Sequence, residues 1–185
     1  AFLSPGEEIL RDPLLLSDME KAVSRLRAAL AKGERVCVYG DYDVDGVTAA
    51  AILSLHLKSL GANVRTYIPD RHREGYGLNE EAVRSLAKDT GLLLTVDCGV
   101  NAVDMAALAK ELGMDIVITD HHRPHESLPD AAALIDAHQP GDQSPCKDLS
   151  GAGVVLKLLT ALEDGDSQGI LEEYADLAAL GTIGD

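Results

Sequence analysis

Aromatic side chains are scarce in this sequence. Its 185 residues include no tryptophan, one phenylalanine and five tyrosines. Grooves that hold single-stranded nucleic acid stack the bases on aromatic rings. The composition therefore offers few rings for a groove of that kind.

Cysteines are also few, and long apolar runs are absent. Cys37, Cys98 and Cys146 form no Cys-x-x-Cys pair and leave one thiol over after any pairing, which argues against a disulfide framework and a cysteine zinc site. No run approaches the ~20 apolar residues of a membrane span, and residues 1–8 lack the basic start and apolar core of a signal peptide. We expect a soluble protein of the reducing cytoplasm, with no membrane partner.

Basic residues are outnumbered. The chain has 31 acidic and 16 basic residues, for a formal net charge of -15. On charge alone this argues against nucleic-acid binding, because such proteins usually present a basic face. The argument weakens only if bound cations neutralise several carboxylates, since such ions can be the largest local charges in a site.

Apolar residues are present in the quantity that one core requires. With 46% hydrophobic residues, the chain is long enough for one sizeable core and too short for two ordinary domains. We therefore interpret residues 1–185 as a single domain. The sequence starts without methionine and stops at Asp185 without a polar tail, so we expect both ends to be cuts in a longer protein.

Short apolar runs alternate with helical patterns along the chain. A capping box at Ser17–Glu20 predicts a first helix that ends at Gly33. Strands are expected at 35–39, 63–68, 92–96, 115–119 and 132–136, and further helices at 47–60, 79–88, 101–112, 150–162 and 170–180. Residues 138–149 are expected to form a connecting loop. This alternation predicts an α/β fold with a doubly wound, mainly parallel sheet flanked by helices.

Acidic residues and histidines follow three of the predicted strands. The stretch 40–46, with Asp41, Asp43 and Asp45, follows the first strand, Asp97 follows the third, and residues 120–122 follow the fourth. The carboxyl ends of parallel strands lie at one edge of a sheet, where ligands bind, so these side chains should converge.

Converging carboxylates repel one another unless cations lie among them. Oxygen ligands with one or two imidazoles suit Mn²⁺ or Mg²⁺ better than structural zinc. Two ions about 3.5–4 Å apart would clamp a phosphate and activate a water between them. The pattern therefore predicts phosphoester hydrolysis.

Each cluster also has a simpler interpretation. Asp-x-Asp-x-Asp-Gly opens calcium EF-hand loops, but Ile52 stands at the twelfth position, where a bidentate glutamate is needed. An aspartate after a strand, such as Asp97, is often only a helix N-cap, and the His121-His122 pair alone is more typical of a solvent-exposed loop. The conjunction at three strand ends favours a metal centre.

These residues resemble a known family. Asp120-His121-His122 is the triplet that names the DHH phosphoesterases, and the segment 40–46 is similar to the first motif of their RecJ branch, the single-strand-specific exonucleases. Thr95–Gly99 and Leu180–Asp185 resemble the second and fourth motifs of that branch. Two further segments, Glu74–Asn79 and Ser150–Gly153, resemble RecJ stretches outside the shared core. The resemblance extends from about Asp12 to the end of the chain.

The resemblance implies roles for individual residues. It implies that Asp97, His121 and His122 are catalytic, that Asp97 bridges the ions, and that His122 contacts the scissile phosphate. Asp120 would orient a histidine. The implied metal ligands are Asp41, Asp43, Asp45, Asp97, His121 and Asp185, and which two of the first three bind directly stays open. Several family members have a histidine where this chain has Tyr39, so carboxylates and water would hold the first ion.

The resemblance also implies a substrate and missing domains. It implies removal of nucleotides from the 5′ end of single-stranded DNA by a monomer, in recombination and repair, and truncation before a DHH-associated domain and an oligonucleotide-binding barrel. Candidate phosphate contacts, each equally compatible with a solvated surface role, are Arg71, His72, Arg73, Arg123, Gly151 and Gly153. The last two would expose amides at a helix N-terminus.

Two other functions remain compatible with the sequence. One is a DHH phosphodiesterase for short oligonucleotides or cyclic dinucleotides, which would lose activity as the substrate lengthens. The other is a non-catalytic replication scaffold of the same fold, which would fail to bind Mn²⁺.

Overall fold

A five-stranded parallel sheet forms the centre of the protein. A computed structural model describes residues 10–185. The strand order is β2-β1-β3-β4-β5, and every neighbouring pair is parallel. The strands are β1 (Val36–Tyr39), β2 (Val64–Tyr67), β3 (Leu92–Val96), β4 (Asp115–Thr119) and β5 (Ala133–Ile135). The chain leaves β1 in one direction and returns on its other side, so the switch in strand order lies between β1 and β3.

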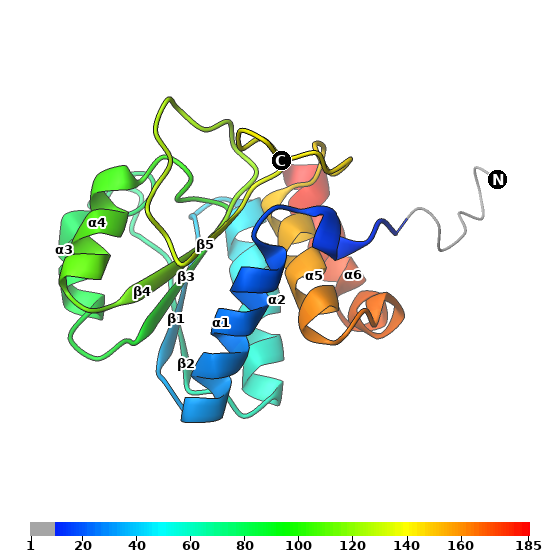
Figure 1. The fold of residues 1–185 in the computed structure, drawn as a ribbon, viewed down its shortest axis with the longest axis horizontal. Helices are drawn as coiled ribbons and strands as arrows, with labels where there is room; N and C mark the ends of the chain where they lie inside the picture. The colour runs from blue at the N-terminus through cyan, green and yellow to red at the C-terminus, as the bar shows by residue number, and fades with distance from the viewer. Residues whose placement is uncertain (1–9) are drawn as a thin grey trace.

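Helices cover both faces of this sheet (Figure 1). On one face, α1, α2, α5 and α6 share a core with alternate strand residues such as Val36 and Val38, and on the other face α3 and α4 pack against Cys37 and Tyr39. A strand buried on both sides is mostly apolar, which explains the apolar runs of β1, β3 and β4. β2, at the edge of the sheet, is only half-buried and carries Arg65 and Thr66. The helices are α1 (Met19–Lys32), α2 (Val44–Ser59), α3 (Glu80–Leu86), α4 (Val103–Glu111), α5 (Gly151–Leu162) and α6 (Ser167–Gly184).

The structure confirms the predicted fold class, and two helices are longer than expected. α2 begins at Val44, because the Asp43 side chain accepts a hydrogen bond from the Gly46 amide and caps the helix. α6 begins at Ser167, where Asp166 caps it through the Gly169 amide. Both of these helices carry predicted metal ligands at or next to one of their ends.

The predicted capping box of α1 is wrong. Asp18, in a left-handed conformation with φ 61°, precedes the helix and makes no side-chain cap. The Ser17 amide donates to Asp142 at 2.8 Å instead, and Asp18 accepts a hydrogen bond from the Leu134 amide. Contacts with distant loops have therefore replaced a local motif.

Two expectations concern the ends of the chain and its relation to membranes. Residues 1–8, used above to argue against a signal peptide, lie outside the described residues. From residue 10 onward, the structure contains no helix with the length and apolar character that crossing a bilayer requires.

Candidate metal centre

Four strands deliver a buried aspartate to the same edge of the sheet. Asp41 follows β1 after one glycine, Asp97 follows β3, Asp120 follows β4, and Asp136 follows β5. Each of the four is at most 2% exposed. Because parallel strands all present their carboxyl ends on one side, sequence positions almost a hundred residues apart meet there. We call the edge formed by these four aspartates the acidic edge.

Close backbone approach shapes the loop after β1. A Cβ atom on Gly46 would lie 2.6 Å from the Asp41 nitrogen, so only glycine allows α2 to start this close to the strand. The Asp43 Oδ1 atom accepts the Gly46 amide at 2.9 Å. This tight turn sets Asp41, Asp43 and Asp45 around the start of α2.

Asp45 connects this loop to α5. Its Oδ2 and Oδ1 atoms accept the amides of Gly151 and Ala152 at 2.5 and 2.9 Å, and the residue is 1% exposed. A carboxylate at a helix N-terminus is favoured by the amide dipoles there. The carboxylate therefore joins α2 to α5 and remains beside the acidic edge.

The amides at the start of α5 are already engaged. Gly151 donates to Asp45, and Gly153 donates to the Ser150 hydroxyl at 3.2 Å. The exposed amides that suggested phosphate contact for these glycines are thus absent. Gly151 instead permits close packing, because a Cβ atom there would lie 2.6 Å from the Asp97 Cβ.

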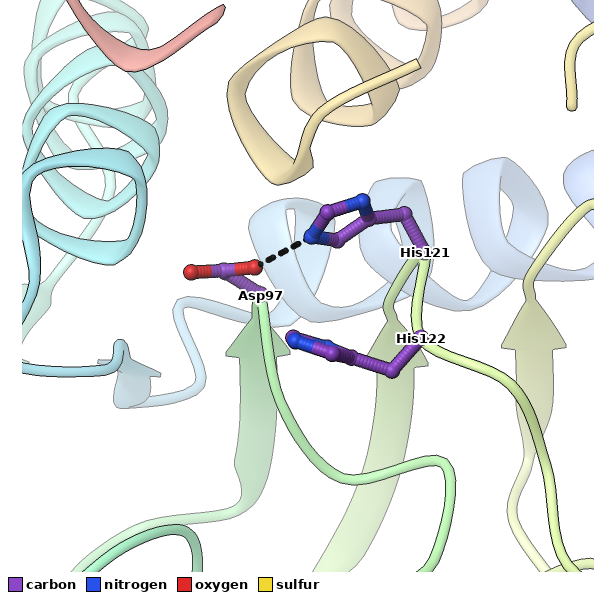
Figure 2. A group of neighbouring side chains, drawn as sticks. All are labelled: Asp97, His121 and His122. Carbon is purple, nitrogen blue, oxygen red and sulfur yellow. Dashed lines mark ion pairs between the residues drawn. The ribbon is translucent and has the colours of Figure 1, made fainter. Parts of the chain in front are cut away.

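Asp97 and His121 form the centre of the site (Figure 2). The Asp97 Oδ1 and His121 Nε2 atoms form an ion pair at 2.9 Å, drawn as a dashed line in Figure 2. Neither atom has a hydrogen-bond partner among the described residues. Asp97 has φ 59°, and the N-cap residue of the next helix, α4, is Ala102, so Asp97 is not the helix cap of the simpler interpretation. Burial, reinforced by the Asp45 and Asp43 charges, raises the pKa of Asp97 to about 7. Burial disfavours a charged imidazole, but Asp97 outweighs it and raises the pKa of His121.

Asp120 orients His122. Its Oδ1 atom lies 2.7 Å from His122 Nδ1 and accepts the amides of His121 and His122, while Oδ2 accepts the Val100 amide at 2.9 Å. Burial alone would raise the pKa of Asp120, but these hydrogen bonds lower it. The hydrogen bond between the two side chains raises the pKa of His122 to about 9. The imidazole is therefore held in one orientation, and Asp120 favours its protonated form.

The ligand-type atoms form three overlapping groups. Within each group the atoms lie within 4.8 Å of one another. Asp97 belongs to two of the groups and His121 to two. The groups are Asp41–Asp43–Asp97, Asp97–His121–His122 and Asp45–His121–Asp185. Asp185 reaches the site from the end of α6, with its Oδ2 atom 3.9 Å from His121 Nδ1.

Several buried polar atoms at this edge have no hydrogen-bond partner among the described residues. They are Asp41 Oδ1, Asp97 Oδ1, His121 Nε2 and Asp136 Oδ2. Leaving buried polar atoms unpaired costs free energy unless another group satisfies them. Carboxylate oxygens and an imidazole nitrogen that converge without hydrogen bonds fit Mn²⁺ or Mg²⁺.

Asp136 is the functional candidate that sequence reasoning missed. It is fully buried, and its Oδ1 atom accepts the His138 amide at 2.6 Å. Burial raises its pKa to about 7, and the Asp120 charge acts in the same direction. The predicted strand at 132–136 included this residue. Ending that strand at Ile135 would have revealed another aspartate at a strand end.

The predicted phosphate-contacting cations lie at the surface. Arg71, His72, Arg73 and Arg123 are all exposed. The Arg71 guanidinium lies 5.1 Å from the centre of the Tyr42 ring, beside the first acidic loop.

The metal-free protein is expected to lose stability as pH rises from 5 to 8. Asp97 and Asp136 have pKa values of about 7, against about 3.9 in an unfolded chain. A carboxyl whose folded pKa is raised contributes stability that is present below the unfolded pKa and lost as pH rises through the folded one. The raised pKa of His122 extends this loss toward pH 9.

Calorimetric melting in EDTA at four pH values would test this expectation. The melting temperature should fall with pH in EDTA, and the increase caused by Mn²⁺ should grow, because metal ligands must be deprotonated. A melting temperature in EDTA that rises between pH 5 and 8 would contradict the assignment of these pKa shifts.

Known proteins match nearly the whole chain. The DHH family, N-terminal domain, matches residues 35–182. The single-stranded-DNA-specific exonuclease RecJ of Bacillus subtilis (strain 168) is 46% identical over 186 residues, an alignment that covers 100% of this chain and 23% of that relative.

Solved structures give the same result. Exonuclease RecJ bound to manganese matches with a TM-score of 0.82 at 39% identity, covering 91% of this chain and 43% of that one. RecJ from Thermus thermophilus in complex with Mn²⁺ matches with a TM-score of 0.75 at 37% identity, covering 91% and 24%. The Mg²⁺ complex of RecJ from the same organism has a TM-score of 0.58 at 33% identity, covering 91% and 20%.

The chain thus spans less than half the length of each of these proteins. The acidic strand ends, the DHH triplet and the matches agree with one another. This chain belongs to the DHH family, in the branch of the RecJ exonucleases.

Proposed function

We propose that the chain is the catalytic part of an exonuclease that hydrolyses single-stranded DNA from its 5′ end with two Mn²⁺ or Mg²⁺ ions. The convergence of buried ligand atoms that lack hydrogen bonds, from three strand ends, carries this proposal. The names of the relatives support the substrate, and the RecJ structures with Mn²⁺ or Mg²⁺ support the choice of ion.

The three ligand groups suggest how two ions would be shared. Asp41 and Asp43 would hold one ion, His121 with Asp185 and Asp45 would hold the other, and Asp97 would bind both. The Asp45 oxygens already accept two amides, so its remaining lone pairs would serve as ligands. Such ions supply an activated water and stabilise the leaving oxygen.

His122 is suited to contact the substrate. Its side chain is 43% exposed, whereas Asp120 behind it is buried. A fixed cation that faces solvent beside the ligand groups would bind a phosphate oxygen of the scissile bond. Arg71, Arg73 and Arg123 would add contacts to the strand.

Several properties of the full protein remain predictions. They are the two C-terminal domains, the monomeric state and the cytoplasmic location. The relatives are two to four times longer than this chain, so parts of the substrate groove are expected beyond these residues.

The test is an exonuclease assay with single-stranded DNA labelled at either end, run with Mn²⁺ and with EDTA. It would use the isolated chain and the full product of its gene, each with an Asp97→Asn control, together with Mn²⁺ calorimetry. Release of 5′ mononucleotides that is lost in the control supports the proposal.

Other outcomes would replace it. Hydrolysis confined to oligonucleotides of a few residues would indicate the short-substrate phosphodiesterase. No hydrolysis together with no Mn²⁺ binding would indicate a non-catalytic relative.

A further inference from the structure

The loop between β2 and α3 contains the Glu74–Asn79 segment, which the proposed ion ligands leave without a role. The buried Tyr39 and the half-buried Tyr67 anchor the loop on both sides of Tyr76. The Tyr67 hydroxyl donates to Glu74 Oε1 at 2.5 Å, and the Tyr39 hydroxyl donates to the Gly77 carbonyl at 2.9 Å. The rings of Tyr39 and Tyr67 stack with their centres 5.2 Å apart. The loop is therefore fixed to the sheet.

Two glycines turn Tyr76 outward. Gly75 and Gly77 have φ values of 78° and 75°, and a Cβ atom on either would contact nothing within 4 Å. These positions need glycine for its left-handed backbone, rather than for space. Tyr76 between them is 58% exposed. The loop thus holds a large ring in solvent on a rigid base.

Tyr76 borders the metal centre. Its ring centre lies 6.2 Å from the His122 ring and 6.4 Å from the Tyr42 ring, and it is nearly perpendicular to both. Tyr42 stands between two predicted ligands, and the Arg71 guanidinium covers its ring. The Tyr76 ring therefore adjoins the histidine expected to meet the scissile phosphate, and it also adjoins the Tyr42 ring, over which Arg71 lies.

We propose that Tyr76, with Tyr42 and Arg71, forms a subsite for the nucleobase next to the scissile phosphate, in which the base stacks on the Tyr76 ring. This inference rests on the proposed function. Stacking on aromatic rings tolerates any base and requires one that is not paired in a duplex. The subsite would therefore favour single strands despite the net charge of -15.

The experiment compares Tyr76→Leu and Tyr76→Phe with the parent in the full product of the gene. Each is assayed on a 5′-phosphorylated strand with a normal or an abasic terminal nucleotide. Tyr76→Leu should raise KM on the normal strand by about 5- to 150-fold, from the usual contribution of one stacked base. On the abasic strand the two proteins should have equal KM. Tyr76→Phe should behave as the parent, and Mn²⁺ affinity should be unchanged in all three.

A binding measurement independent of turnover uses the absence of tryptophan. In the isolated 185-residue chain, which has no tryptophan, Tyr76→Trp introduces a single one, whose fluorescence a stacked base should quench. A phosphorothioate strand with a terminal base should quench it, and the abasic strand should not.

Three results would overturn the subsite. They are an unchanged KM for Tyr76→Leu, an equal loss on the abasic strand, and a loss in Tyr76→Phe that matches Tyr76→Leu, which would assign the effect to the hydroxyl. A parent that neither binds nor cleaves single-stranded DNA would instead refute the proposed function, and the subsite with it.

Discussion

Asp97→Asn is expected to lower Mn²⁺-dependent hydrolysis by more than about 100-fold. Removing a residue that only supports a ligand costs ~10- to 100-fold in metal affinity or activity, and Asp97 itself belongs to two of the ligand groups. Asparagine keeps the shape of the side chain and tolerates the positive φ of this position, so the fold should be retained.

The same substitution should stabilise the metal-free protein. The folded structure holds a buried carboxylate with a raised pKa among other acids, and the amide removes that charge. At pH 8 the gain should be on the order of 2 kcal/mol, or roughly 4–8 °C in melting temperature. Addition of Mn²⁺ should stabilise the variant less than the parent.

Melting curves and kinetics together distinguish the loss of a metal ligand from a general loss of folding. A misfolded variant would have both a lower activity and a lower melting temperature in EDTA. A variant that melts earlier in EDTA, or keeps its Mn²⁺-dependent rate, would contradict the role given to Asp97.

The acidic edge could be predicted because its signal is local. An apolar strand run followed at once by an aspartate gives both the strand and the position of the side chain, as at Asp97 and Asp120. Asp136 was not predicted as a site residue because β5 has only three residues, and the predicted strand at 132–136 included the aspartate that follows it. Short strands leave their ends poorly defined by pattern.

Contacts between distant segments could not be predicted in this way. Asp45 caps α5 across more than a hundred residues, and Asp142 displaces the expected cap of α1 by binding Ser17. No local pattern reports either contact. Only the resemblance of Glu74–Asn79 to RecJ proteins pointed to the segment around Tyr76, because the proposed role of Tyr76 depends on where the folded loop places its ring.

The net charge of -15 argues less strongly against nucleic-acid binding once the positions of the acidic residues are known. Five of its acids lie buried at or beside one edge, where bound cations would offset their charge, and His122, which is proposed to face the phosphate, has a raised pKa. The local charge that a phosphate meets then differs in sign from the charge of the whole chain.

Gly151→Ala is expected to lower Mn²⁺-dependent activity by about 100-fold. The added methyl group would lie 2.6 Å from the Asp97 Cβ and 2.9 Å from its Oδ1, and the Gly151 amide is bound to Asp45. The start of α5 must shift, which displaces two predicted ligands together. Misplacement of reacting groups by about 1 Å can cost ~100-fold in rate.

Gly153→Ala is the matched control in the same first turn. The nearest atoms to its methyl group would belong to the flexible Leu149 side chain, at 3.1 Å, so its rate and Mn²⁺ affinity should stay within about two-fold of the parent. Alanine also favours a helix by up to ~1 kcal/mol over glycine, so poor folding of α5 should not explain a defect in Gly151→Ala. Equal rates for the two variants would show that the α5 start does not position Asp97. A selective loss in Gly151→Ala, with Mn²⁺ affinity reduced and circular dichroism unchanged, would show that packing between α5 and β3 positions the metal centre.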